Sequence, residues 1–149
     1  MMEKQNDNRM QYNRRRDILS TLWIFLAVNY ILCDVLSNME SSVLKGLLEG
    51  KTAGIVMNQG FLLAAAISLE IPFVMILLSK VLKFKINKII NIIAGLFMAL
   101  YQLGSFFVGS APSLHYIFFS VIEIIGNLFI VGYAWKWSEA EKVNKEESN

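Results

Sequence analysis

Four long apolar blocks, separated by short polar segments, dominate the pattern of hydrophobic and polar positions along the chain. They run over residues 18–39, 61–82, 86–108 and 114–135, and each reaches the roughly 20 residues that a membrane-spanning helix needs. Residues 1–17 are polar and basic, and residues 138–149 are highly charged. The pattern predicts an all-α fold: a four-helix up-and-down transmembrane bundle over residues 18–137, with a polar tail on either side.

The composition supports this prediction and narrows the chemistry. Of the 149 residues, 55% are hydrophobic and 17% charged, which is too apolar for a disordered segment or an ordinary soluble domain. The net charge of +2 gives no footprint for nucleic acid. A single cysteine, Cys33, and a single histidine, His115, exclude an intramolecular disulfide and an ordinary zinc site. We expect no cofactor, no metal and no nucleic-acid partner, and the common catalytic motifs are missing from the sequence.

The connections between the blocks differ in length. Residues 81–88 and 109–113 are so short that the blocks they join must be antiparallel neighbours. The first connection is longer and contains apolar residues at helical spacing between Ser42 and Gly50. With Ser41 or Ser42 as N-cap and Gly50 as the stop, it predicts a short helix on the outer membrane interface. The alternative is a mobile loop.

The basic residues predict the orientation of the bundle. Twelve of the 14 Lys and Arg residues lie in the two tails or around the connection between the second and third blocks, and only Lys45 and Lys51 lie on the opposite side. We expect the protein to be a multi-pass protein of the plasma membrane. By the positive-inside rule, both of its termini should lie in the cytoplasm.

Each block also carries a stripe of polar and small residues, which in a lipid environment should face other helices. The stripes are Trp23, Ala27, Tyr30, Asp34 and Ser37 in the first block; Ala66 and Glu70 in the second, beside the run Ala64–Ala66; Asn91, Gly95, Met98, Gln102, Ser105 and Gly109 in the third; and Tyr116, Ser120, Glu123 and Asn127 in the fourth. Four converging stripes predict a polar core. Alternatively, the Asn, Gln and Gly positions serve packing alone.

The acids inside the blocks are the strongest candidates for function. Glu70 and Glu123 each lie nine residues from the outer end of their block, or roughly 13 to 14 Å deep at about 1.5 Å per residue, whereas Asp34 lies nearer the outside. An ionised carboxylate is disfavoured at that depth, and the basic residues inside the blocks, Lys80 and Lys88, lie close to the block ends and far from the glutamates. We therefore expect the two glutamates to be protonated or to share a proton, beside a helix bend at Pro72. The alternative is that they are structural, bonding to Asn91, Gln102 or Asn127.

The chain also resembles a family of small four-span prokaryotic membrane proteins that is defined only as a domain of unknown function. The resemblance covers nearly all of residues 17–137, and Lys88 and His115 stand where the family pattern suggests arginine and tyrosine. It implies a multi-pass membrane protein and no particular activity. The segments that carry it are Leu19–Phe25 with Asn29, Tyr30 and Asp34; Phe61–Ile67 with Glu70–Pro72, Leu78 and Ser79; Asn87 with Asn91–Gly95; and Tyr116–Phe119 with Glu123 and Tyr133–Trp137.

Three functions are compatible with these features. The leading hypothesis is binding or transport of a small cationic or apolar molecule in an intramembrane pocket, with the glutamates as proton-carrying groups. The second is a membrane enzyme that uses the glutamates as general acid and base on a lipid-like substrate, and the third is a non-catalytic accessory subunit. The lipid bilayer and a small-molecule ligand are the expected partners, and the pattern does not specify an oligomeric state. The candidate site residues are Glu70, Glu123, Asp34, Asn91, Gln102, Asn127 and Tyr30.

Overall fold

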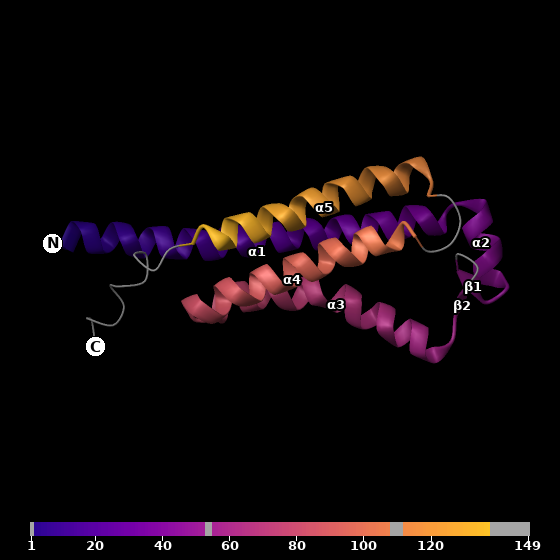
Figure 1. Ribbon diagram of the computed structural model, residues 1–149, viewed down its shortest axis with the longest axis horizontal. Coiled ribbons are helices and arrows are strands. Elements are labelled where there is room, and N and C mark those ends of the chain that lie inside the picture. Colours follow the sequence, from indigo (N-terminus) through magenta and orange to yellow (C-terminus); the bar gives the residue numbers. More distant parts are fainter. Residues whose placement is uncertain (1, 53–54, 108–111, 138–149) are drawn as a thin grey trace.

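The computed structural model describes residues 2–52, 55–107 and 112–137. The chain has four long helices, each antiparallel to the one before it (Figure 1). They are α1 (Met2–Asn38), α3 (Gln59–Val81), α4 (Phe84–Ser105) and α5 (Leu114–Trp135). A short helix, α2 (Ser41–Leu48), and a hairpin of β1 (Lys51–Thr52) and β2 (Ile55–Val56) lie at one end, which we call the loop end. The opposite end, where α1 begins and α5 ends, is the terminal end.

The four helices match the predicted blocks within a few residues, except at the start of α1. This helix begins at Met2 rather than near Ile18, so the polar segment predicted as a tail continues the first helix. No glycine or proline occurs in Met2–Asn38, and therefore nothing in the backbone interrupts the helix. The segments Met10–Asn38, Gln59–Val81, Phe84–Ser105 and Leu114–Trp135 are long and apolar enough to cross a membrane.

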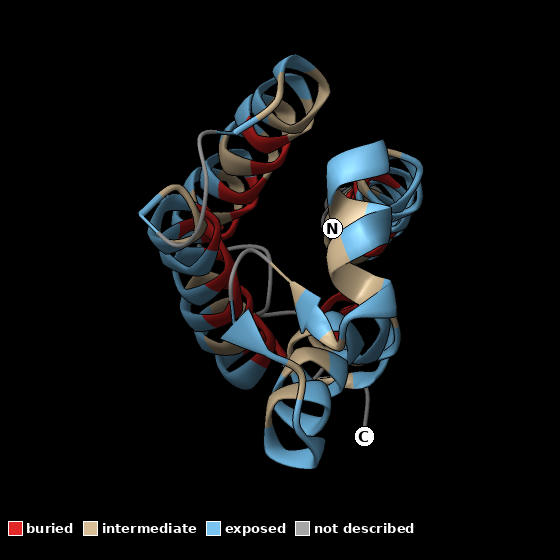
Figure 2. Ribbon diagram, turned by 90° about the vertical axis from the view of Figure 1, so that its right-hand side faces the viewer, coloured by how far each residue is buried: buried red, intermediate tan, exposed pale blue. Residues whose placement is uncertain are grey.

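The helices pack in the order α3, α1, α5, α4, with little contact between α3 and α4. Figure 2, a view along the helices from the loop end, shows buried residues on the faces that the helices turn toward one another. The core contains Leu19, Trp23 and Leu26 of α1, Met98 of α4 and Ile130 of α5. The α1 and α5 helices therefore form the middle of the bundle, and α3 lies at its edge.

Two glycines permit the close packing around α5. A Cβ atom at Gly126 would lie 2.7 Å from Leu26 Cδ2, and one at Gly95 would lie 2.8 Å from Val131 Cγ2. Both distances are shorter than side-chain carbons tolerate, so a larger residue at either position would require the facing Leu26 or Val131 side chain to shift. The predicted stripe position of Gly95 is thus confirmed as a packing position.

The half of α3 nearest the loop end is weakly packed. The N-cap of α3 is Asn58, whose Oδ1 accepts a hydrogen bond from Phe61 N at 2.8 Å. The buried residues of this helix, Pro72, Met75 and Ser79, all lie in its other half. Ala64 and Ala66 are exposed, so the expectation that the small residues of this helix face its neighbours in the bundle is wrong for these two. The sequence is apolar on both faces of α3 and did not indicate which face packs.

At the loop end, the predicted short helix is confirmed and its cap is corrected. The N-cap of α2 is Glu40, whose carbonyl accepts the first helical bond from Leu44 N at 2.9 Å. Ser42 is already inside the helix and donates its hydroxyl to Glu40 Oε1 at 3.0 Å. Gly50, with φ of 73°, provides the turn that leads into the hairpin. The hairpin was not predicted because each of its strands has only two residues.

At the terminal end, basic side chains bind the carbonyl groups at or just after helix ends. Arg15 Nη1 donates to Tyr133 O and Arg16 Nε to Ser79 O, both at 3.4 Å. Lys88 Nζ donates to Trp137 O at 2.8 Å. These carbonyl groups lie in the last turn of α3 and at the end of α5, where helix backbones lack internal donors and cations are favoured.

Candidate functional site

A first group of buried polar residues joins α1, α3 and α4 near the terminal end, and we call it the asparagine network. Asn91 Oδ1 accepts from Trp23 Nε1 at 2.7 Å and from Ser79 Oγ at 3.2 Å. Asn91 Nδ2 donates to Asn87 Oδ1 at 2.7 Å, and Asn87 Nδ2 donates to Ser79 O at 2.7 Å. Every side-chain amide and indole group in the network has a partner, which is the arrangement expected of a structural contact.

A second group lies between α1, α4 and α5, and we call it the Glu123 cluster: Tyr30, Gln102, Ser120, Glu123 and Asn127. Asn127 Nδ2 donates to Tyr30 Oη at 2.7 Å and to Glu123 O at 2.8 Å, and Gln102 Nε2 donates to Ser120 Oγ at 2.6 Å. Glu123 is 1% exposed, yet its Oε1 atom and the Oδ1 atom of Asn127 have no hydrogen-bond partner. The cluster thus holds two unfilled acceptor oxygens, one turn apart on α5.

Two bonds between α1 and α5 place Asp34 beside this cluster. Tyr30 bonds to Asn127 on the terminal side, and Ser37 Oγ lies 3.3 Å from His115 Nε2 on the loop side. Because α1 and α5 are antiparallel, Asp34 and Glu123 both lie in the stretch between these bonds. Asp34 itself is exposed, in contrast to Glu123.

Above the Glu123 cluster, a vestibule of about 1200 Å³ opens at the loop end. Its wall includes Asp34 and Ser37 of α1, Ser105 of α4 and Tyr116 of α5, together with parts of α2, the hairpin and the first turn of α3. Tyr116 Oη donates to Ser105 Oγ at 2.6 Å, and Ser105 Oγ donates to Gln102 O at 2.6 Å. These two hydrogen bonds lead from the vestibule wall to the main-chain carbonyl of Gln102, and no residue of the Glu123 cluster lines the vestibule.

Glu70 lies in a different environment from Glu123. It is exposed, and within the described part of the chain its side chain makes no hydrogen bond or ion pair. It also lies outside the residues that line the vestibule. The structure therefore does not place the two glutamates in one buried polar core, as their equal depth had suggested. A joint role as general acid and base has no geometric support in this structure.

The other predicted residues have clear positions. Asn91, Gln102 and Asn127 are buried, as is Tyr30 at 7% exposure. They divide between the asparagine network and the Glu123 cluster instead of forming one core. Gly109 lies outside the described residues.

Some residues of the asparagine network and of the vestibule wall were not predicted as site residues. Ser79 and Asn87 of the asparagine network had a signal, because Asn87 precedes Asn91 by one helical turn. Tyr101 and Phe61, which line the vestibule, had none, because Tyr101 lies off the polar stripe of α4 and Phe61 lies in a helix that is apolar on both faces.

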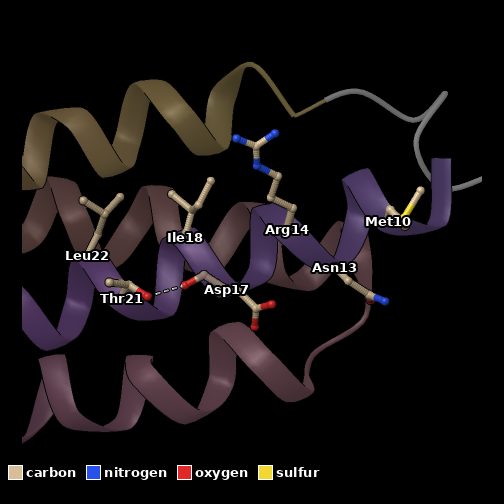
Figure 3. Close-up of a pocket in the computed structure, with 7 residues that line it drawn as sticks. All are labelled: Met10, Asn13, Arg14, Asp17, Ile18, Thr21 and Leu22. Atoms are coloured by element: carbon tan, nitrogen blue, oxygen red, sulfur yellow. Dashed lines mark hydrogen bonds between the residues drawn. The ribbon is translucent and has the colours of Figure 1, made fainter. Parts of the chain in front are cut away.

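Another hollow lies along the terminal half of α1, but it lacks the features of a site. Figure 3 shows its lining: Met10, Asn13, Arg14, Asp17, Ile18, Thr21 and Leu22. All of these residues belong to α1, and the hydrogen bond among them, from Thr21 Oγ1 to Asp17 O at 2.8 Å, is internal to the helix. Across residues 2–52, 55–107 and 112–137, no three His, Cys, Asp or Glu side chains are grouped to hold a metal ion.

The fold and the site together define a class of protein. It is all-helical, with four apolar helices that could cross a membrane and a buried acid beneath a vestibule at one end. The chain belongs to a family of unknown function, DUF6326, which it matches over residues 9–144. No curated protein and no solved structure is significantly similar to it.

Proposed function

We propose that the chain is a multi-pass protein of the cell membrane that binds, and in doing so transports, a small cationic or apolar molecule at the Glu123 cluster. The observation that carries this proposal is the buried carboxyl group of Glu123, whose Oε1 atom has no partner, beneath an open vestibule with Asp34 in its wall. An unfilled carboxylate oxygen in an apolar interior is unfavourable, and a proton or a cation relieves it.

The vestibule is suited to a molecule of drug-like size. Its volume of about 1200 Å³ is large enough for a ligand that fills an ordinary pocket, which measures about 300 to 1,000 Å³. Asp34 in the vestibule wall attracts positive charge, while Tyr101, Phe106 and Tyr116 supply aromatic faces on which cations bind. A cation would enter past Asp34 and displace a proton from Glu123.

The proposed orientation puts the terminal end in the cytoplasm and the vestibule outside. It is supported by the basic residues, since Arg14, Arg15, Arg16 and Lys88 all belong to the terminal end. Single cysteines at Asn6 and Ser148, in a Cys33→Ser background, should be labelled by an impermeant maleimide only after the cells are opened. Labelling of either position in intact cells would contradict the orientation.

Ligand binding is tested with the full-length chain in lipid nanodiscs and tetraphenylphosphonium as the probe, with triphenylphosphine oxide as a neutral molecule of similar bulk. We expect Glu123→Gln to weaken binding of the cation at least tenfold. The neutral molecule should bind to the variant and to wild type with equal affinity. Glu70→Gln is the matched control, because it makes the same chemical change outside the cluster, and it should leave both affinities unchanged. Equal binding of the cation to wild type and Glu123→Gln would contradict the proposal.

Transport is tested separately in proteoliposomes. An imposed pH gradient should drive uptake of the cation with the wild-type chain and not with Glu123→Gln, because cation and proton compete for one carboxyl group. Binding that depends on Glu123 without any pH-driven uptake would restrict the protein to a binding role.

A further inference from the structure

The outward side of α3 has an unusual composition for a helix at the edge of the bundle. Its exposed residues at spacings of four and three form what we call the Glu70 stripe: Gln59, Leu63, Ala66, Glu70, Phe73 and Leu77. Leu63 is 63% exposed, Phe73 40% and Leu77 67%. This spacing is the heptad pattern by which two helices pack side by side in a left-handed pair.

The stripe points away from the bundle. Helical geometry of about 100° per residue places Glu70 about 160° around α3 from Pro72, and Pro72 is buried against the other helices together with Met75 and Ser79. Glu70 is also the central residue of Gln59–Val81, eleven residues from each end. In the membrane orientation proposed above, the acid lies near the midplane and faces away from its own bundle.

The other long helices do not share this feature. Among the described residues, the outward positions at mid-height are apolar in α1 (Ile24, Val28), α4 (Ile93, Leu96) and α5 (Val121, Ile125). An unpartnered acid facing acyl chains is strongly disfavoured, and polar residues inside membranes therefore lie in contacts with other helices. Moreover, only 11% of the most apolar 18 residues of α3 are buried, against 28% to 44% in the other three helices.

We propose that the Glu70 stripe is an interface through which two copies of this chain pair, with their α3 helices parallel and the two Glu70 side chains opposite one another. A protonated carboxyl group has one donor and one acceptor, so it complements an identical group across a two-fold axis. No other residue on the stripe offers a hydrogen-bonding group at this depth. The Glu70 carboxyl group of a second copy thus supplies the hydrogen-bond partner that Glu70 lacks, and no other kind of partner is needed.

Pairing through this face leaves the vestibule open. Phe61, which lines the vestibule, lies on the side of α3 opposite the stripe. The inference rests on membrane insertion as proposed above, but not on ligand binding by the Glu123 cluster. Loss of pairing through the Glu70 stripe can therefore be distinguished from loss of ligand binding at the Glu123 cluster.

The interface is tested by disulfide cross-linking in native membranes, in a Cys33→Ser background. Because equivalent residues meet at a two-fold axis, Ala66→Cys and Leu77→Cys should each form a covalent dimer under mild oxidation. Ile93→Cys, at a position on the outward face of α4 that is 60% exposed, is the matched control and should remain monomeric. Resistance of the chain to carbonate extraction shows insertion independently.

A second measurement addresses Glu70 itself, by following the monomer–dimer equilibrium of the full-length chain in detergent. Glu70→Leu should weaken dimerisation by about three- to thirtyfold, the range of interhelical hydrogen bonds, whereas Glu70→Gln should retain it because an amide is also self-complementary. The proposal would be overturned if position 93 cross-linked as well as positions 66 and 77, or if those two positions did not cross-link. It would also be overturned if they cross-linked only to a different protein. A Glu70→Leu variant that dimerises like wild type would overturn it as well.

Discussion

The asparagine network and the Glu123 cluster are built from the same kinds of side chain but differ in how completely their polar groups are paired. In the network, Asn91 Oδ1 alone accepts two bonds, from Trp23 and Ser79. In the cluster, Glu123 Oε1 and Asn127 Oδ1 accept none. The network is enclosed by α1, α3 and α4, whereas the cluster lies beneath an open vestibule. A buried polar group with all its partners holds helices together. A buried polar group with a missing partner is not explained by packing alone, which is why we propose the Glu123 cluster as the ligand site.

The comparison predicts that the largest loss of stability follows from breaking the network. Asn91→Leu leaves Trp23 Nε1, Ser79 Oγ and Asn87 Oδ1 without their partner, and we expect the free energy of unfolding to fall by about 2–4 kcal/mol. The measurement is denaturant unfolding in mixed micelles followed by circular dichroism. Ile89→Leu, on the exposed side of α4, is the control and should change stability by less than about 0.5 kcal/mol. A small effect of Asn91→Leu would mean that the network is not structural.

An intermediate loss is expected at the α1–α5 contact that closes the cluster. Gly126→Leu inserts a side chain where a Cβ atom already lies 2.7 Å from Leu26 Cδ2, and overpacking of this kind destabilises by about 1–3 kcal/mol. Leu26→Ala in the same chain makes room, so the double variant should recover part of the loss. If the two losses were simply additive, the steric explanation would be wrong.

Within the cluster, Glu123→Gln should change stability by no more than about 1 kcal/mol, in contrast to Asn91→Leu. The glutamine amide keeps the shape of the carboxyl group and offers a donor one turn from Asn127 Oδ1, which lacks a partner. The same unfolding assay measures the effect. A loss as large as that of Asn91→Leu would show that Glu123 is a structural residue.

The smallest expected effect is the coupling between the two glutamates. Glu70 is exposed and Glu123 is buried, so the changes in unfolding free energy from Glu70→Gln and Glu123→Gln should add within about 0.5 kcal/mol in the double variant, as for independent sites. A double-mutant cycle on monomeric protein in micelles measures this. A coupling above about 1 kcal/mol would show that the two carboxyl groups share a site after all.

The sequence predicts the inward stripes of α4 and α5 well, because Asn91, Gly95, Met98 and Gln102 repeat at one helical period against a strongly apolar background. The sequence does not predict which side of α3 packs inward, because both faces of this helix are apolar and Glu70 was taken to mark the inward side. Equal distance from the helix ends fixed the depth of Glu70 and Glu123 but not the direction in which each side chain points. That direction depends on contacts between distant segments, such as Ser20 Oγ with Ile76 O at 3.0 Å, which no local pattern encodes.

The vestibule could not be predicted for a related reason. It is lined by six separate parts of the chain, among them α2 and the hairpin, and its size depends on how far the first half of α3 stands away from the other helices. Asp34 was recognised as nearer the outside, but its position in the vestibule wall depends on the α1–α5 register set by Tyr30 and Ser37.

The most direct test of the central claim, that ligand binds beneath the vestibule at the Glu123 cluster, is to map where a photoreactive quaternary ammonium compound attaches to the full-length chain in nanodiscs. Our account predicts adducts on residues 34–38, 101–106 and 112–116 that tetraphenylphosphonium competes away and that Glu123→Gln abolishes. Competable adducts confined to the α1 groove at residues 10–22 or to the Glu70 stripe, and unaffected by Glu123→Gln, would contradict it.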